Sequence, residues 1–325
     1  MNRAMIVGTG SCLPKRVLTN ADLEKMVETT DEWITVRTGI KERRIAGAGE
    51  ETSRLAAEAA RKAMEMAGVS AEEIGMIIVG TMTCEKAMPS CACLVQKEIG
   101  AVNAFAMDIN AACSGFLYGM DIAEKYIKAD PALKVLVIGA ETLSSRTNWE
   151  DRTTCVLFGD GAGAVLMTGT DGERGVLGSR LFADGSLWHL LHMDAAPSLN
   201  PALVAEDYQG PYIRMAGQEV FKYAVRAMQD GVAKVLAQEN IDPEAVRLVI
   251  PHQANIRILN SLTDRLGIAA EKIYINVHKY GNTSAASMPI ALDEANREGR
   301  LQPGDLVLFC AFGGGFTWGA AIMRW

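Results

Sequence analysis

The chain repeats one pattern of a helix, a short turn and an apolar strand, and this repeat constrains the fold more than any other feature. In the first copy, Thr52–Ala67 places alanine and methionine at helical spacing, and the strand Met76–Val79 follows after a turn. In the second copy, the amphipathic helix Phe221–Glu239 leads through the turn Asn240–Pro243 to the strand Leu248–Ile250. Alternation of helices with short β-branched strands is typical of α/β proteins. The pattern predicts two packed copies of one α/β unit.

Both copies continue with a turn of small residues that opens a helix. Ala111–Ser114 precedes the helical pattern Phe116–Ile127, and Thr283–Ala286 precedes the helix from Met288 to Asn296. Each copy then has an apolar strand and a glycine-rich segment: Lys134–Ile138 with Gly159–Leu166, and Asp305–Phe309 with Gly313–Ala320. We therefore divide the chain into residues 1–170 and 171–325, with an irregular insertion at about 180–212. A site at the junction would take residues from equivalent loops of both halves.

Composition and charge exclude several classes of protein. With 325 residues, 49% hydrophobic and 22% charged, the chain resembles an ordinary soluble enzyme. The net charge of -7 argues against general binding to nucleic acid or to an anionic membrane. No apolar run has the length of a signal peptide core or a membrane span. Seven scattered cysteines without a CxxC pair, and only four histidines, predict no metal site and a cytoplasmic location.

Cys113 stands where the strand Phe105–Ile109 turns into a helix. A thiol at that point lies at the positive end of the helix dipole, which favours the thiolate. Its neighbours are alanine, serine and glycine, which leave room for a substrate. The alternative is a buried structural cysteine, because free cysteine is often buried and inert. The residues around Cys113 leave both interpretations open.

The matching loops carry the polar groups that a nucleophilic cysteine needs. His252 directly follows a strand, and Asn282 offers an amide donor before the last long helix. Gly313–Gly315 brings backbone N–H groups close enough together to form an oxyanion hole. Taken singly, His252 could be a core histidine and Asn282 a helix cap. Their occurrence with Cys113 in equivalent loops favours a joint catalytic role.

Other motifs have simpler interpretations. His278 is interpreted as structural or as a residue that supports the catalytic groups, and His189 and His192 have no assigned chemistry. Phosphate binding is disfavoured, because no Lys-Ser/Thr follows the late glycines and Gly8-x-Gly10 lacks a third glycine. Gly159–Gly163 is interpreted as a tight turn between strands.

Taken together, these residues resemble β-ketoacyl-acyl carrier protein synthase III, a condensing enzyme family of the thiolase superfamily. The resemblance covers nearly the whole chain. It includes Gly8-Thr9-Gly10, Asp31-Glu32-Trp33-Ile34, Arg37-Thr38-Gly39-Ile40, Ala111–Phe116, Phe158–Gly163, His252-Gln253-Ala254-Asn255, Gly281–Ser287 and Phe312–Gly319. It implies an α/β, thiolase-like, duplicated αβαβα five-layered fold with mixed sheets. The Cys–His–Asn set separates this family from thiolases, which use a second cysteine, and from elongating synthases, which use two histidines.

The resemblance also implies a mechanism without a metal or cofactor. Cys113 takes an acyl group from a short acyl-CoA, and His252 and Asn282 stabilise the enolate formed when malonyl-acyl carrier protein loses carbon dioxide. The backbone N–H groups of Cys113 and Gly314 hold the tetrahedral oxyanion. The product, a 3-oxoacyl-acyl carrier protein, initiates type II fatty acid synthesis. The same resemblance implies a homodimer.

Further residues match binding positions of the family. The expected CoA contacts are Thr29, Trp33, Arg37, Arg152, Gly217, Phe221, Ala254 and Asn255. The acidic carrier protein is expected to dock on Lys222, Arg257 and Arg265, with Arg226 adding charge and Asp264 weakening the patch. The expected acyl pocket is formed by Leu143, Leu157 and Phe158, and by Met88, whose segment Ala87–Ser90 resembles one that crosses the dimer interface and closes the acyl pocket of the partner subunit. Met88 replaces a frequent phenylalanine, and the flexibility of methionine predicts tolerance of longer or branched primers.

Two other functions stay open at this stage. One is a condensing enzyme or acyltransferase of secondary metabolism with the same Cys–His–Asn set and a different acceptor. The other is a non-catalytic acyl-CoA-binding homologue, which would be expected to lack Cys113, His252 or Asn282. All three residues are present.

Overall fold

The computed structural model describes residues 3–204 and 208–325, with side chains for all of them except residues 263–266. The first half contains β1 (Arg3–Cys12), β2 (Arg16–Thr19), α1 (Asn20–Leu23), α2 (Asp31–Thr38), β3 (Glu42–Ile45), α3 (Thr52–Ala67), β4 (Met76–Gly80), α4 (Cys91–Ile99), β5 (Phe105–Ile109), α5 (Gly115–Ala129), β6 (Val135–Thr142), α6 (Arg152–Cys155) and β7 (Asp160–Thr170). The second half contains β8 (Gly175–Ala183), β9 (Leu191–Met193), β10 (Ile213–Met215), α7 (Gly217–Gln238), β11 (Leu248–Pro251), α8 (Ile256–Leu266), α9 (Val277–Tyr280), α10 (Ser287–Arg297), β12 (Leu306–Gly313) and β13 (Thr317–Arg324).

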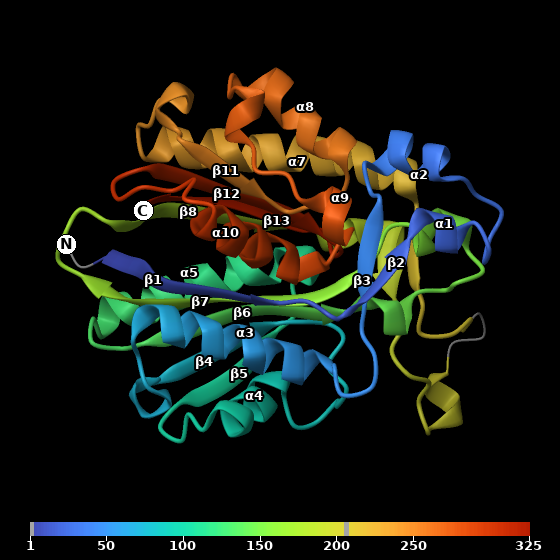
Figure 1. Ribbon diagram of the computed structural model, residues 1–325, viewed down its shortest axis with the longest axis horizontal. Coiled ribbons are helices and arrows are strands. Elements are labelled where there is room, and N and C mark those ends of the chain that lie inside the picture. The colour runs from blue at the N-terminus through green and yellow to red at the C-terminus, as the bar shows by residue number, and fades with distance from the viewer. Residues whose placement is uncertain (1–2, 205–207) are drawn as a thin grey trace.

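Two mixed sheets and three helical layers alternate through the molecule (Figure 1). Helices α3 and α4 cover one sheet, α7 and α8 cover the other, and α5 and α10 lie between the sheets. Strand β4 shows how side-chain alternation fills these layers. Met76 and Ile78 pack toward the middle helices, while Ile77 and Val79 pack toward α3. The predicted five-layered α/β fold is confirmed.

The strand orders of the two sheets match each other. The first sheet has the order β1-β7-β6-β4-β5, and the second has β8-β13-β12-β11. In both, the first three strands are antiparallel and the fourth is parallel to the third. A parallel bridge between Val249 and Ile273 takes the place of β5 in the second sheet. This match supports the proposed boundary at 170/171, which lies between β7 and β8.

Gly159–Gly163 is not a tight turn, and that prediction is wrong. From Asp160 onward these residues form the start of β7. A Cβ at Gly163 would lie 2.6 Å from the backbone nitrogen of Ile290 on α10, and a Cβ at Gly159 would collide with the carbonyl oxygen of Tyr280. These glycines therefore let the second half pack closely on the first.

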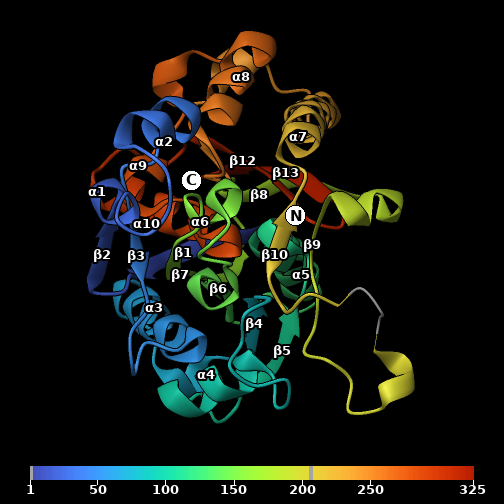
Figure 2. The same ribbon diagram turned by 90° about the vertical axis from the view of Figure 1, so that its right-hand side faces the viewer.

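The segment 180–212 is also more regular than predicted. It begins inside β8 and includes β9, which pairs antiparallel with β10. This small hairpin lies near the end of the molecule that faces the viewer in Figure 2.

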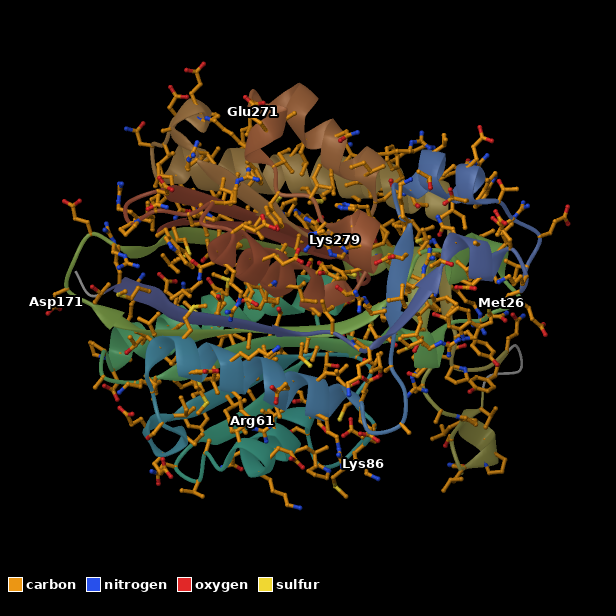
Figure 3. All side chains as sticks on the ribbon, viewed as in Figure 1. Met26, Arg61, Lys86, Asp171, Glu271 and Lys279 are labelled. Atoms are coloured by element: carbon orange, nitrogen blue, oxygen red, sulfur yellow. The ribbon has the colours of Figure 1, made fainter. Side chains whose placement is uncertain are left out.

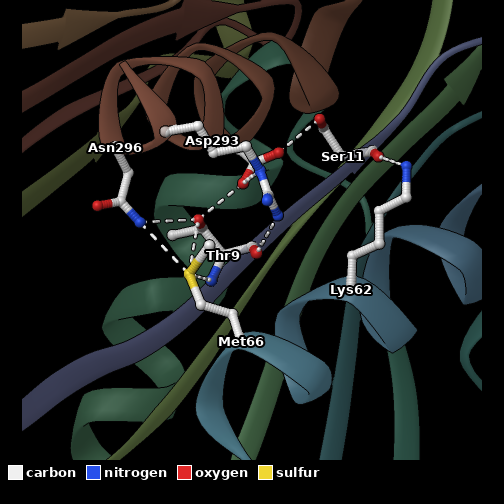
Figure 4. A network of polar contacts seen from close by, with 7 residues as sticks. Thr9, Ser11, Lys62, Met66, Asp293 and Asn296 are labelled. Atoms are coloured by element: carbon white, nitrogen blue, oxygen red, sulfur yellow. Dashed lines mark hydrogen bonds and ion pairs between the residues drawn. The ribbon is translucent and has the colours of Figure 1, made fainter. Parts of the chain in front are cut away.

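Charged side chains lie mainly outside the packed layers. Lys86, Asp171 and Glu271 are exposed at the periphery of the molecule (Figure 3). Several polar groups are nevertheless buried, and one network of them joins α10 to β1 and α3 (Figure 4). No helix in the described ranges has the length and apolarity needed to cross a membrane.

Candidate active site

A cavity of about 1150 Å³ brings the predicted catalytic residues together. Cys113, His252 and Asn282 line it, although they come from both halves of the chain. Helices α2, α6 and α7 and strand β10 supply further lining residues, and these elements lie toward the end of the molecule that faces the viewer in Figure 2. The predicted junction between equivalent loops is therefore the place where these polar groups meet.

Cys113 lies in a single 3-10 turn, Ala112–Ser114, directly before α5. The second half holds this turn in place. Thr317 donates its hydroxyl to the carbonyl of Ala111 at 2.7 Å, and Ser114 donates to the carbonyl of Thr317 at 3.1 Å. Burial raises the pKa of the Cys113 thiol to about 12, which outweighs the lowering by the Ser284 hydroxyl and a backbone N–H. The thiol therefore needs a proton acceptor when it reacts.

His252 is buried and neutral. Burial lowers its pKa to about 3. Its Nδ1 lies 2.7 Å from the Ser287 hydroxyl oxygen, which also accepts the N–H of Gln253 at 3.2 Å. The Ser287 O–H can donate to Nδ1, and in that arrangement the His252 proton is on Nε2, which can donate a hydrogen bond into the cavity.

The side chain of Asn282 is oriented by its own loop. Its Oδ1 accepts the backbone N–H of Ser284 at 2.8 Å, and its backbone bonds to Leu157 and Gly159 on the first half. With the carbonyl oxygen engaged in this way, the amide nitrogen Nδ2 can serve as a donor in the cavity.

The turn between β12 and β13 lies against Cys113. A Cβ at Gly313 would lie 2.6 Å from the backbone nitrogen of Cys113, and a Cβ at Gly314 would lie 3.0 Å from the carbonyl oxygen of Leu191. Gly314 itself lines the cavity. Only residues without a side chain allow the backbone to come so close to Cys113.

The guanidinium groups of two arginines lie over the indole ring of Trp33 in the cavity lining. The guanidinium carbons of Arg37 and Arg152 lie 4.6 and 4.9 Å from the centre of the indole ring. A purine held between Trp33 and Arg152 needs about 7 Å, twice the usual contact distance. Binding of a purine between Trp33 and Arg152 therefore requires Arg152 to move outward, away from its 3.0 Å hydrogen bond to the carbonyl of Glu28.

The structure places most other predicted binding residues around the same cavity. Gly217, Phe221, Lys222, Ala254, Asn255 and Arg257 all line it. Asn255 caps α8 through the N–H of Arg257 and donates to the carbonyl of Arg37, so its side chain links α8 to α2. Thr29 does not line the cavity, and its buried hydroxyl has no hydrogen-bond partner in the described part of the chain. The side chains of Arg265 and Asp264 lie outside the described residues.

The expected acyl pocket is only partly assembled in this chain. Leu157 and Phe158 line the cavity. Leu143 is fully buried behind Phe158, and Met88 is 86% exposed and away from the cavity. The cavity also has an apolar wall that was not predicted from the sequence, formed by Met82, Leu191, Met193 and Ile213. The alternation of apolar and polar residues in Leu191-His192-Met193 is typical of a strand with one apolar face, and this pattern could have predicted the wall.

Among the described residues, no group of three or more histidines, cysteines, aspartates or glutamates is arranged to hold a metal ion.

Comparison with known proteins identifies the family. Residues 107–185 match the model of 3-oxoacyl-[acyl-carrier-protein (ACP)] synthase III, and residues 236–325 match the model of its C-terminal part. The chain is 55% identical over 321 residues to β-ketoacyl-[acyl-carrier-protein] synthase III of Desulfotalea psychrophila, covering 99% of both chains.

Two solved structures extend this comparison. The crystal structure of 3-oxoacyl-[acyl-carrier-protein] synthase III from Aquifex aeolicus has a TM-score of 0.92 and 52% identity, over 99% of this chain and 100% of that one. The priming β-ketosynthase of the R1128 polyketide pathway has a TM-score of 0.93 and 32% identity, over 99% and 96% of the two chains. The chain therefore belongs to the β-ketoacyl-[acyl-carrier-protein] synthase III family.

Proposed function

We propose that this enzyme condenses a short acyl-CoA primer with malonyl-acyl carrier protein and so initiates type II fatty acid synthesis. One observation carries the proposal: a thiol, a neutral imidazole and a free amide donor from three separate loops line one cavity. The 55% identity to a named synthase over nearly the whole chain supports the same reaction. The products are a 3-oxoacyl-acyl carrier protein, carbon dioxide and free CoA.

The first half-reaction transfers the acyl group to Cys113. The sulfur attacks the thioester carbonyl, and the backbone N–H groups of Cys113 and Gly314 are proposed to hold the oxyanion. The close packing of the Gly313–Gly315 turn against Cys113 supports this assignment. The acyl-Cys113 thioester keeps the acyl carbon electrophilic while CoA leaves and the second substrate enters.

The second half-reaction needs hydrogen-bond donors at the thioester oxygen of the malonyl group. Negative charge collects on that oxygen as carbon dioxide leaves, so two neutral donors are sufficient and the proposed reaction uses no metal or cofactor. The Nε2–H of His252 and the Nδ2 amide of Asn282 are the proposed donors. The low pKa of His252 keeps it neutral at pH 7, so it stabilises the enolate without transferring a proton to it.

The substrates are proposed to approach through the cavity mouth. Trp33, Arg37 and Arg152 would bind the adenine and phosphates of CoA once Arg152 swings away from the ring. The carrier protein would dock on a basic patch of Lys222, Arg226 and Arg257. Lys222 and Arg226 lie one turn apart on α7. The guanidinium carbon of Arg257, on α8, lies 5.5 Å from the ring centre of Phe221, which is also on α7.

A homodimer and a cytoplasmic location belong to the same proposal. Strand β5 ends the first sheet, so its outer edge has no partner strand within the described chain. Phe105 on β5 is 44% exposed and Met88 is 86% exposed, which fits a second copy covering this edge. All seven cysteines are free thiols, as expected in a reducing compartment. Sedimentation of the purified chain at twice its monomer mass is the expected result.

Half-reaction assays test the assignment of the catalytic residues. H252A and N282A should still be acetylated on Cys113 by acetyl-CoA, but they should release carbon dioxide from malonyl-acyl carrier protein at least about 100-fold more slowly. Loss of acetylation in both variants, with decarboxylation intact, would contradict the proposed roles. A polyketide priming role is the second candidate, and rapid discharge of acyl-Cys113 onto a non-malonyl acceptor would favour it.

A further inference from the structure

Glu141 is a buried carboxyl group that the mechanism described above does not use. It lies near the end of β6 and has no exposed surface. Its Oε2 accepts the Thr83 hydroxyl at 2.5 Å and the Met82 N–H at 3.3 Å. Its Oε1 has no hydrogen-bond partner among the described residues. Buried polar atoms without a partner are rare and call for an explanation.

The alternation of side chains along β6 directs Glu141 toward the 3-10 turn Ser284–Ala286 of the second half. Gly139 and Glu141 lie on the same face of β6 because side chains alternate along a strand. A Cβ at Gly139 would collide with the carbonyl oxygen of Ala285 in the 3-10 turn Ser284–Ala286. Glu141 therefore faces the turn Ser284–Ala286. This turn packs against Ala112–Ser114, the turn that contains Cys113.

Ser284 lies between Glu141 and the nucleophile. It is 1% exposed and its backbone adopts a left-handed φ of 50°, which is unfavourable for serine. Its hydroxyl oxygen completes no hydrogen bond within the described structure. Yet it is near enough to both neighbours to lower the pKa of the Cys113 thiol and of the Glu141 carboxyl. A buried hydroxyl without a fixed partner, between a thiol and a carboxyl group, is suited to pass a proton between them.

We propose that Glu141 accepts the proton of the Cys113 thiol through the Ser284 hydroxyl when Cys113 attacks the acyl-CoA. This rests on the function proposed above and adds to it a destination for the thiol proton. The Sγ–H bond breaks as the bond from Sγ to the acyl carbon forms. The thiol proton passes to Ser284, and the hydroxyl proton of Ser284 passes to Oε1 of Glu141.

The remaining steps balance this transfer. CoA leaves as a thiolate and takes a proton from water. When condensation later expels Cys113 as a thiolate, Glu141 returns the stored proton by the same route. Free Cys113 binds a proton more tightly than Glu141 does, so the proton resides on Glu141 only while the sulfur is acylated. Glu141 and Ser284 act through Cys113 and are thus positioning residues for its proton.

This relay predicts a pH dependence with a definite sign. Burial raises the pKa of Glu141 to about 7, so Glu141 is a proton acceptor above that pH and is already protonated below it. The pKa values of Cys113, about 12, and His252, about 3, keep both groups in one protonation state across neutral pH. The hydroxyls of Thr81, Thr83 and Ser284 also face Glu141 but do not titrate in this range.

The test is the rate of Cys113 modification between about pH 5 and pH 9. Alkylation by iodoacetamide and acetylation by acetyl-CoA are both followed by peptide mass spectrometry, because the chain has seven cysteines. For the wild-type protein the rate should rise in one step centred near pH 7 and level off above it, whereas direct ionisation of the Cys113 thiol would increase the rate about tenfold per pH unit without levelling off. E141Q should lack this rise and react about 100-fold more slowly at about pH 8. E141D should retain the rise, because it keeps a carboxylate.

A second variant tests the middle of the relay without straining the backbone. S284G removes the hydroxyl, and glycine readily adopts the left-handed conformation found there. It should also lose the rise. The matched control is E124Q, which alters a buried glutamate paired with Lys125 and Lys128, about two and a half turns from the first residue of α5. E124Q should keep the wild-type profile.

A purely electrostatic role for Glu141 predicts the opposite sign. A negative carboxylate raises the pKa of Cys113, so its removal alone would make the thiol more reactive. Faster modification of E141Q, or an unchanged rise in E141Q or S284G, would overturn the relay and leave the condensation proposal intact. Wild-type protein that shows the alkylation rise but accepts no acetyl group would instead contradict the proposed function.

Discussion

Two carboxyl groups are buried where the halves of the molecule meet, and their surroundings differ sharply. Both oxygens of Asp293 are bonded: Oδ1 accepts from Thr9 at 2.7 Å and from Arg297 at 2.9 Å, and Oδ2 accepts from Ser11 at 2.6 Å (Figure 4). Glu141 has no cation bound to it in the described structure, and one of its oxygens has no partner. Burial alone therefore does not separate a structural acid from one that takes part in a reaction.

The difference lies in whether the charge is satisfied. Asp293 is held by two hydroxyls and a guanidinium, an arrangement that stabilises a fixed negative charge. Glu141 has hydroxyl and amide donors on one oxygen only, and burial raises its pKa to about 7. An acid that is incompletely hydrogen-bonded beside a nucleophile can change its protonation state near neutral pH. The two sites should therefore respond differently to substitution.

Replacing Asp293 should produce the larger loss of stability. In D293A the buried hydroxyl of Thr9 and the partly buried hydroxyl of Ser11 lose a charged acceptor, so the free energy of unfolding should fall by about 4 kcal/mol. Urea unfolding measures this, with exposed Glu298→Ala as a control expected to change by less than about 0.5 kcal/mol. The pH profile of Cys113 modification should stay unchanged, and a shifted profile would break the contrast between the two sites.

Replacing Glu141 should change how stability depends on pH. Its folded pKa of about 7 lies above the ordinary value of 4.5, so the folded protein holds this proton more tightly than the unfolded chain does. The free energy of unfolding of the wild type, relative to E141Q, should decrease by about 3 kcal/mol as the pH rises from about 4.5 to above 7. Urea unfolding of both proteins at matched pH values isolates this difference, and a constant difference across pH would contradict it.

Removing the main donor to Glu141 should move its titration. T83V eliminates the 2.5 Å hydrogen bond to Oε2, which disfavours the carboxylate and raises its pKa further. The rise in Cys113 modification should therefore shift upward by about one pH unit. T52V is the control, because Thr52 bonds to Thr83 and Thr142 in the same cluster without contacting Glu141. An equal shift in T52V would show that the effect comes from general repacking.

The smallest expected change in stability comes from removing a single donor to Asp293. S11A removes a partly buried donor to Oδ2 while Thr9 and Arg297 still hold the carboxylate. The free energy of unfolding should fall by about 1 kcal/mol, as measured by urea unfolding, with Cys113 reactivity unchanged. If S11A loses as much stability as D293A, the charge of the Asp293 carboxylate is not shared among its several donors.

The sequence predicted the fold and the meeting of the catalytic loops because both follow from local, repeated patterns. Cys113, His252 and Asn282 each lie at a strand end or helix start, and the repeat placed those points at one junction. The interpretation of Gly159–Gly163 failed because its cause is non-local. Those glycines accommodate Tyr280 and α10, which lie more than a hundred residues away.

Glu141 was missed for a related reason. A glutamate near the end of a strand is usually solvent-exposed, and its sequence position does not reveal that η8, the turn Ser284–Ala286, covers it. A signal was present nevertheless. The run Val135–Ala140 is apolar or glycine at every position, which is typical of a strand buried on both faces, so an acid that continues it is anomalous.

The central claim, that Cys113 carries the primer acyl group between two substrates, is tested most directly by mass spectrometry of the protein mixed with acetyl-CoA. We expect one acetyl group on Cys113 and none in C113A, and discharge of that group when malonyl-acyl carrier protein is added. Absence of the adduct on Cys113, or its persistence in the presence of malonyl-acyl carrier protein, would contradict the claim.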